Sequence, residues 1–121
     1  VFRPQPNGSA LVVDFNLAGT PYQALNGGPQ FRHSEAASIS VLTKDQEETD
    51  RLWAALTANG GSESMCGWLV DRYGVSWQIV PEALPRFIMD PDREAAGRAM
   101  RAMMGMRKID IAGLEAAFRG A

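Results

Sequence analysis

Two side chains near one loop could carry out acid–base chemistry. His33 is the only histidine, so it is the only ordinary side chain that titrates near neutral pH. If Glu35 accepts its proton, the pair works as a polarised general base, and His33 is therefore the candidate catalytic residue. Two alternatives stay open: His33 is an exposed loop residue without a role, and the Glu35 carboxylate accepts backbone amide protons from the loop at residues 26–28.

The single cysteine, Cys66, is the other reactive side chain. One cysteine excludes an intrachain disulfide and every multi-cysteine zinc motif. A catalytic thiol needs a neighbouring base or a helix N-terminus, and the sequence around Cys66 supplies neither. We interpret Cys66 as a half-buried structural residue. The presence of only one cysteine, together with the lack of a signal peptide or a long apolar stretch, indicates a cytoplasmic protein.

Composition and charge restrict the class of partner. The chain has 121 residues, of which 45% are hydrophobic and 21% are charged, as in an ordinary folded domain. The formal net charge is -2, so the chain has no overall attraction to nucleic acid or to an anionic membrane. We therefore expect neither nucleic acid nor membrane as a partner.

The clearest pattern for positioning polar side chains is the segment of residues 66–81. Two apolar runs flank the sequence Asp-Arg-Tyr-Gly at residues 71–74, which is typical of a β-hairpin. The second run alternates, so that Trp77 and Ile79 share one face of the strand and Gln78 lies on the other. Gln78 then faces either solvent or a cavity. Which of the two it faces largely decides whether it can take part in a functional site.

Strands are also expected earlier in the chain. A half-buried strand is predicted over residues 11–17 and a short partner strand over residues 22–25, joined by a Gly-containing turn at residues 18–21. Another strand is predicted over residues 38–42. In the last of these, Ser38 and Ser40 alternate with apolar residues.

Helices are predicted at three places. The first covers residues 43–59 and begins with one of two capping boxes, Thr43 with Gln46 or Asp45 with Glu48, between which the sequence does not choose. A second is expected to begin with an N-cap and a proline at residues 90–91 and to continue to about residue 106. A last short helix follows residue 110. This order of elements indicates an α+β domain with a mainly antiparallel sheet. We expect one domain over residues 1–121, with residues 90–121 as its helical C-terminal tail.

Several motifs together resemble a known family. The sequence Cys-Gly-Trp-Leu-Val-Asp-Arg-Tyr-Gly-Val-Ser-Trp-Gln-Ile at residues 66–79 is the longest of them; the others lie at residues 26–31, 35–36, 50–53 and 103–111. In these motifs the chain resembles the PhnB-like family, also labelled 3-demethylubiquinone-9 3-methyltransferase-like. This family is placed in the glyoxalase/bleomycin resistance/dioxygenase (vicinal oxygen chelate) superfamily. The resemblance extends over about residues 11–118.

The resemblance implies a glyoxalase-like fold of paired β-α-β-β-β modules that curl around a pocket, and it implies a homodimer. The first strand and helix of the leading module have no counterpart before Val1, so we expect the domain to be N-terminally incomplete. The methyltransferase label is not expected to describe an activity. S-adenosylmethionine sites usually follow a strand with a Gly-rich turn and a helix, and no such arrangement is visible in this sequence.

The resemblance also implies where a metal or a ligand would bind. Superfamily enzymes hold a divalent metal with His, Glu or Gln from several strands, and Gln78 falls where a glutamate ligand is often found. Ser38 and Ser40 lie near the position of a first-strand histidine, and serine is a poor ligand for such metals. Gln23 is a weaker candidate on the other module. A divalent metal is therefore not favoured.

Our leading hypothesis is a protein that binds a small molecule in a sheet-lined pocket. Its expected ligand-binding residues are Ser38, Ser40 and Gln78 on the polar face, with Asn26, Phe31 and Glu35 at the rim. The alternatives are a metal-dependent lyase, isomerase or dioxygenase that uses His33, and a dimeric sequestering protein without enzymatic activity.

Overall fold

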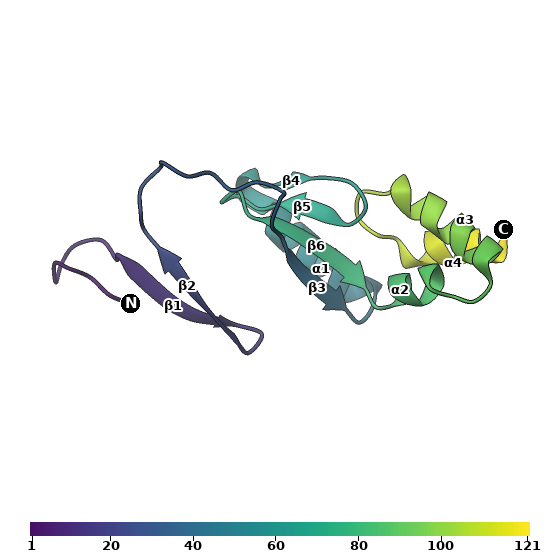
Figure 1. Cartoon of the computed structure of the whole chain (residues 1–121), viewed down its shortest axis with the longest axis horizontal. Coiled ribbons are helices and arrows are strands. Elements are labelled where there is room, and N and C mark those ends of the chain that lie inside the picture. The colour runs from purple at the N-terminus through teal and green to yellow at the C-terminus, as the bar shows by residue number, and fades with distance from the viewer. The chain divides into compact units, whose positions relative to one another are not determined.

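The chain folds as an α+β protein with two separate β-sheets and four α-helices (Figure 1). The computed structural model describes all 121 residues. By the contacts within the chain it divides into two compact units, Val1–Arg32 and His33–Ala121. The α+β class is therefore confirmed, whereas a single domain over residues 1–121 stays a prediction.

The first unit is built on a two-stranded antiparallel hairpin. Strand β1 (Val12–Leu17) pairs with β2 (Thr20–Leu25) through a two-residue turn. Ala18 and Gly19 in this turn have φ angles of 49° and 84°, as two-residue hairpin turns require. Phe15 and Tyr22 stack across the strands with their ring centroids 5.7 Å apart. Nearly all residues of this hairpin are exposed. The two predicted strands are confirmed, but the turn is two residues long rather than four, since β2 already begins at Thr20. The predicted half-burial of the first strand was wrong, because only Val12 and Val13 of β1 are partly buried.

The second unit begins with a β-α-β-β-β module. Its elements are β3 (Ile39–Thr43), α1 (Gln46–Thr57), β4 (Ser62–Glu63), β5 (Trp68–Val70) and β6 (Ser76–Pro81), with a 3-10 turn at Ala58–Gly60 after α1. The sheet has the order β3-β6-β5-β4, in which β3 and β6 are parallel and the other pairs antiparallel. Helix α1 is the crossover that the parallel pair needs. The sequence did not predict β4, because a strand of two residues carries no alternation.

Helix α1 packs on one face of this sheet. Trp53 from α1, Leu69 from β5 and Ile79 from β6 form its buried core. The helix begins after Asp45, whose Oδ1 atom accepts the backbone N–H of Glu48 at 2.8 Å. Of the two predicted capping residues, Thr43 and Asp45, the structure therefore uses Asp45, and the Glu48 side chain accepts the N–H of Lys44 rather than that of Asp45. Burying these apolar side chains on α1 and the strands is the main stabilisation of the module.

Asp71 shapes the tight connection between β5 and β6. Its Oδ1 atom accepts the backbone N–H groups of Tyr73 and Val75, at 2.8 and 3.0 Å. Its Oδ2 atom accepts the indole N–H of Trp77 at 2.9 Å. Gly74 completes the turn with a φ angle of 88°. One carboxylate thus fixes both the turn and the tryptophan that packs against α1.

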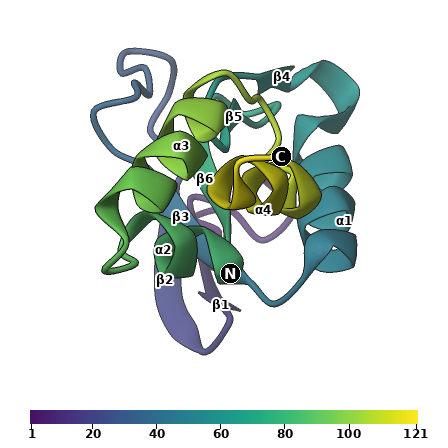
Figure 2. The same ribbon diagram turned by 90° about the vertical axis from the view of Figure 1, so that its right-hand side faces the viewer.

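Three helices follow the sheet. They are α2 (Ala83–Ile88), α3 (Arg93–Met104) and α4 (Ile111–Arg119). Figure 2 shows α3 and α4 side by side, with α2 next to α3. Leu84, Ile109 and Leu114 form a second buried core among them. None of the helices is both long and apolar enough to cross a membrane.

The predicted ends of α3 were wrong at both sides. The N-cap is Asp92, whose Oδ1 atom accepts the N–H of Ala95 at 3.1 Å. Asp90 cannot be the cap, because its own Oδ1 atom accepts the N–H of Asp92 at 2.9 Å in the preceding turn. At the other end the helix stops at Met104 rather than near residue 106.

The early end of α3 has its cause in the segment that leads to α4, residues 105–110, which we call the connector. The backbone oxygens of Met106 and Arg107 accept N–H groups from Cys66 and Gly67, at 2.7 and 2.8 Å. Gly67 has a φ angle of 84°, and a Cβ atom there would lie 3.0 Å from the Ile79 oxygen. A glycine is therefore required where the connector meets the sheet.

Candidate functional site

The face of the four-stranded sheet opposite α1 carries an uncharged set of side chains. We call it the open face. The strand registers place eight residues on it, and Ser38, just before β3, joins them through its bond to Gln78: Ser38, Ser40, Leu42, Ser62, Trp68, Val70, Ser76, Gln78 and Val80. None of them is charged, and five are serine or glutamine. The alternation predicted for β6 is confirmed, since Trp77 and Ile79 lie in the α1 core and Gln78 does not.

Three of these residues form a row across the centre of the open face. Gln78 is the register partner of Ser40 on one side and of Trp68 on the other. Residues paired in this way point to the same side of a sheet. Gln78 is half-buried, and its Nε2 atom donates a hydrogen bond to Ser38 Oγ at 2.9 Å. The structure thus brings together the three predicted strand residues, Ser38, Ser40 and Gln78, from positions 40 residues apart.

The open face is bounded on one end by the C-terminal helices. Val80, the open-face residue near the end of β6, packs against the second core with Leu84 and Ile109. At the same end of the neighbouring strand, Leu42 is 62% exposed. The polar row is therefore flanked by apolar side chains, as in sites that bind organic molecules.

The predicted rim residues belong to different units. Asn26 and Phe31 lie in the Val1–Arg32 unit, where Asn26 donates its backbone N–H to Leu11 at 2.8 Å and Phe31 is 94% exposed. Glu35 lies in the other unit and is exposed. Their role at the rim of a binding site stays a prediction.

His33 lies beside the turn between β5 and β6. A Cβ atom built on Gly74 would be 3.8 Å from His33 Cδ2. The His33 side chain is exposed, and no hydrogen bond joins it to Glu35. Its catalytic role also stays a prediction. Cys66 is half-buried, and its thiol points to the Met104 backbone oxygen at 3.8 Å, which agrees with a structural role.

The side chains of the open face do not suit a divalent metal. They include no imidazole, thiol or carboxylate, and nowhere in the structure do three or more His, Cys, Asp or Glu side chains gather as metal ligands would. Hard and borderline divalent cations need such ligands, because neutral hydroxyl and amide oxygens leave the metal charge uncompensated.

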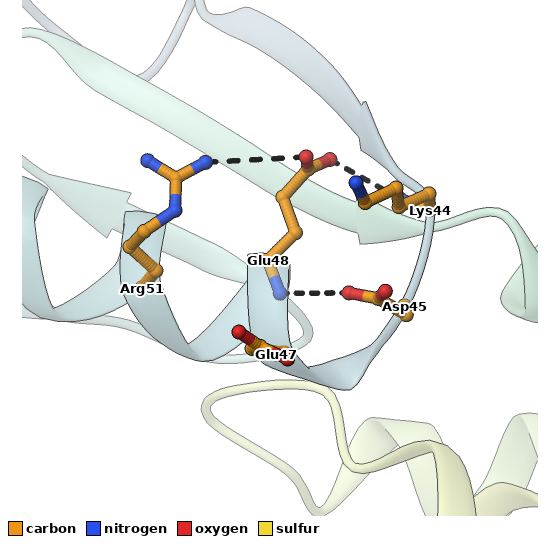
Figure 3. A pocket seen from close by; sticks show the side chains of 5 residues that line it. All are labelled: Lys44, Asp45, Glu47, Glu48 and Arg51. Atoms are coloured by element: carbon orange, nitrogen blue, oxygen red, sulfur yellow. Dashed lines mark hydrogen bonds and ion pairs between the residues drawn. The ribbon is translucent and has the colours of Figure 1, made fainter.

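A polar hollow of about 130 Å³ lies at the start of α1, between Lys44, Asp45, Glu47, Glu48 and Arg51 (Figure 3). Two of its three carboxylates, those of Asp45 and Glu48, are already bonded within the protein. Asp45 caps the helix, and Glu48 accepts the Lys44 N–H at 3.2 Å and pairs with Arg51 at 3.9 Å. This hollow therefore stabilises the helix start rather than forming a ligand site.

A larger cavity of about 450 Å³ lies where the starts of α1 and α4 meet α2. Lys44, Arg86, Asp110 and Glu115 are among the residues that line it. Sequence reasoning missed this cavity, because its residues come from three separate segments that no single sequence pattern joins. Glu115 is already paired with Arg119 on the same helix. The remaining charged groups show no single preference for an anion or a cation.

Comparison with known protein families identifies the family of this chain. The family model described as 3-demethylubiquinone-9 3-methyltransferase matches residues 2–80 of the chain. The match covers β1 to β6 almost completely, including the whole hairpin that carries Gln78. The chain belongs to this family. The predicted resemblance is thereby confirmed up to Val80, whereas the likeness of the C-terminal segment to the family stays a prediction.

Solved structures agree with the family assignment. A PhnB protein from Bacillus cereus that carries the same family label is similar with 27% identity and a TM-score of 0.59, over 66% of this chain and 74% of that one. Protein PA1353 from Pseudomonas aeruginosa shares the fold, with 23% identity and a TM-score of 0.52, over 65% of this chain and 71% of that one. Curated protein sequences give no significant match.

Proposed function

We propose that this PhnB-like protein binds a small organic molecule on the open face of its four-stranded sheet, as a member of the glyoxalase superfamily. The observation that carries the proposal is the row of Ser40, Gln78 and Trp68 on the side away from α1. The free polar groups of this row reach solvent, because no buried side-chain nitrogen or oxygen lacks a hydrogen-bond partner. A ligand would take the place of that water and accept or donate the same hydrogen bonds.

The family label is not proposed as an activity. The one strand that leads directly into an α-helix through a parallel crossover is β3, and Lys44 and Asp45 join it to α1. Nucleotide-type cofactors are usually held by a Gly-rich turn at that place, because only glycine lets the backbone approach the ligand closely. The proposal is therefore binding, without a methyl-transfer step.

A homodimer is part of the proposal. An isolated two-stranded hairpin is marginally stable in water, yet β1 and β2 carry the exposed aromatic pair of Phe15 and Tyr22. Covering these side chains with a second copy of the chain would remove their apolar surface from water.

The lone thiol of Cys66 supports a reducing compartment, the cytoplasm.

Amide chemical shifts of the labelled chain test the binding proposal. In a screen of small organic fragments, binders should shift the resonances of Ser40, Gln78 and Trp68 and leave those of the exposed face of α1 unchanged. Glu47→Gln on α1 is the matched control, because it should bind the same fragments equally well. A screen whose binders all shift residues away from the open face would overturn the proposal. Sedimentation equilibrium tests the dimer separately.

A further inference from the structure

The proposed binding face has a definite hydrogen-bonding character that limits the chemistry of its ligand. We infer that the ligand is an uncharged, planar molecule that presents a carbonyl oxygen next to an N–H group, as in lactams and cyclic imides. The inference rests on the proposed function, because it takes the open face as the site. It depends on which polar atoms of the row are already bonded and on where the charged residues lie.

The bonded and free polar groups of the row can be counted. Gln78 uses one N–H in the bond to Ser38 Oγ at 2.9 Å. Its other N–H and its Oε1 atom make no hydrogen bond within the protein, so one amide group offers a donor and an acceptor together. The Ser40 hydroxyl and the Trp68 indole N–H are also without partners. The row therefore offers both donors and acceptors, and none of the groups is charged.

The absence of charged side chains on the open face argues against ionic ligands. An anion bound on this face would lose water without meeting a lysine or an arginine, and a cation would meet no carboxylate. Removing an ion from water without a charged partner is expensive. A neutral ligand loses only ordinary hydrogen bonds to water, which Gln78 and Ser40 replace.

The geometry of the row favours a flat molecule. Neighbouring strands lie about 4.8 Å apart, so the row from Ser40 through Gln78 to Trp68 spans about 10 Å. A two-ring molecule can lie along this distance, with one edge at the Gln78 amide and one ring against the Trp68 indole. Aromatic contacts of this kind favour planar partners over aliphatic ones. Leu42 and Val80 border the row with apolar surface.

Three probes of similar size separate the possibilities. 2-Quinolone is a neutral lactam with adjacent C=O and N–H groups, N-methyl-2-quinolone lacks the N–H, and 2-naphthoate is an anion. Each is titrated into the full chain, and the dissociation constant is taken from amide shifts of the open-face residues. We expect 2-quinolone to bind about threefold more tightly than its N-methyl derivative, through one hydrogen bond. We expect 2-naphthoate not to shift the open face.

Variants then test the residues. Gln78→Met keeps the side-chain length but removes both hydrogen-bonding groups, and should weaken 2-quinolone about tenfold. It should weaken N-methyl-2-quinolone less. Ser40→Ala should weaken 2-quinolone by a smaller factor, and Glu47→Gln on α1 should leave all three probes unchanged. An amide spectrum that is otherwise unaltered shows that each variant is folded.

The possible failures are distinguishable. If 2-naphthoate binds the open face as tightly as 2-quinolone, or if Gln78→Met leaves the affinity for 2-quinolone unchanged, the ligand class is wrong although the face still binds small molecules. If the shifts from every probe and every screened fragment fall elsewhere on the chain, the proposed function fails, and this inference fails with it.

Discussion

The two faces of the four-stranded sheet are made from alternating residues of the same strands, yet their polar side chains differ in burial and in hydrogen bonding. On the face covered by α1, Thr43 is fully buried and its hydroxyl bonds to that of Thr49 at 2.6 Å. On the open face, the Ser40 hydroxyl makes no hydrogen bond, although it lies only three residues earlier in β3. The buried Thr43 hydroxyl on the covered face is thus bonded to the helix, whereas the exposed Ser40 hydroxyl on the open face remains available to a ligand.

The largest expected effect is a difference in stability between two variants, each of which truncates one leucine to alanine on one face of the sheet. Leu69 in β5 is fully buried against Trp53, whereas Leu42 in β3 is 62% exposed. We expect Leu69→Ala to lower the free energy of unfolding by about 3 kcal/mol, through lost burial and the cavity left behind. Leu42→Ala should lower it by less than about 0.5 kcal/mol. Urea denaturation of both variants measures the difference.

Equal losses for the two leucine variants would show that the open face is covered as tightly as the other. That cover would then have to come from outside the four-stranded sheet and its helices. In that case the dependence of the Leu42→Ala effect on protein concentration would tell whether a second copy is responsible, because dimer formation adds stability that rises with concentration.

A second pair of substitutions compares hydroxyl groups. Thr49→Val keeps the shape of the side chain but leaves the buried Thr43 hydroxyl and the Asp45 carbonyl, now bonded to Thr49 at 2.6 and 2.9 Å, without that partner. We expect a loss of about 1–2 kcal/mol in the free energy of unfolding. Ser40→Ala should change it by less than about 0.5 kcal/mol. A destabilisation by Ser40→Ala that matches Thr49→Val would contradict the view that the Ser40 hydroxyl is unused in the folded chain.

The faces themselves could be predicted from the sequence, because a strand has a period of two residues. The alternation of Trp77, Gln78 and Ile79 was enough to separate the α1 side from the polar side. The bond from Gln78 to Ser38 could not be predicted in the same way. It depends on the parallel register of β3 and β6, and no local pattern fixes the alignment of strands that are separated by a helix.

Helix ends were predicted less well, because several side chains competed for the same role. Asp90 and Asp92 are both good N-cap residues, and the structure uses Asp92 since Asp90 is engaged in the preceding turn. At the other end of α3, the backbone of Met106 bonds to Cys66 instead of continuing the helix. That bond joins residues 40 positions apart, and helix propensity, which is a local property of the sequence, gives no information about such a contact.

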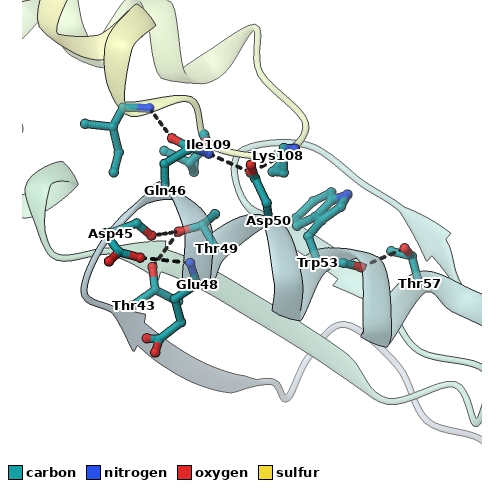
Figure 4. A network of polar contacts seen from close by, with 11 residues as sticks. Thr43, Asp45, Gln46, Glu48, Thr49, Asp50, Trp53, Thr57, Lys108 and Ile109 are labelled. Carbon is teal, nitrogen blue, oxygen red and sulfur yellow. Dashed lines mark hydrogen bonds and ion pairs between the residues drawn. The ribbon is translucent and has the colours of Figure 1, made fainter.

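Gln46 is the residue whose role was furthest from prediction. Its side chain donates to the Ile109 carbonyl at 3.0 Å and to Asp50 at 2.8 Å, and it accepts the Ile111 N–H at 2.8 Å (Figure 4). One amide thus ties α1 to the connector and to the start of α4. From the sequence, Gln46 was predicted only as a member of one possible capping box with Thr43, because its partners in the connector and in α4 lie more than 60 residues away.

The smallest expected effect concerns a charged side chain on α1, the helix that covers one face of the sheet. The Asp50 carboxylate accepts hydrogen bonds from Gln46 Nε2 at 2.8 Å and from Lys108 Nζ at 2.9 Å (Figure 4). The bond from Gln46, and then that from Lys108, lower the pKa of Asp50 below its ordinary value near 3.8. Because the carboxyl group has a lower pKa folded than unfolded, its contribution to stability is present above the ordinary value and is lost as the pH falls through the lowered one.

Asp50→Asn should therefore lower the free energy of unfolding slightly at about pH 6 and by less at about pH 3, where the carboxyl group of the unfolded chain is largely protonated. The loss is small because the Asp50 side chain is 48% exposed. Urea denaturation at both pH values measures it, and Glu47→Gln, which removes a carboxylate without a hydrogen bond or an ion pair from the same helix, is the matched control. Two variants with the same pH dependence would mean that the connector is held to α1 by the Gln46 amide alone. Charge would then be as unimportant on the covered side of the sheet as it is on the open face.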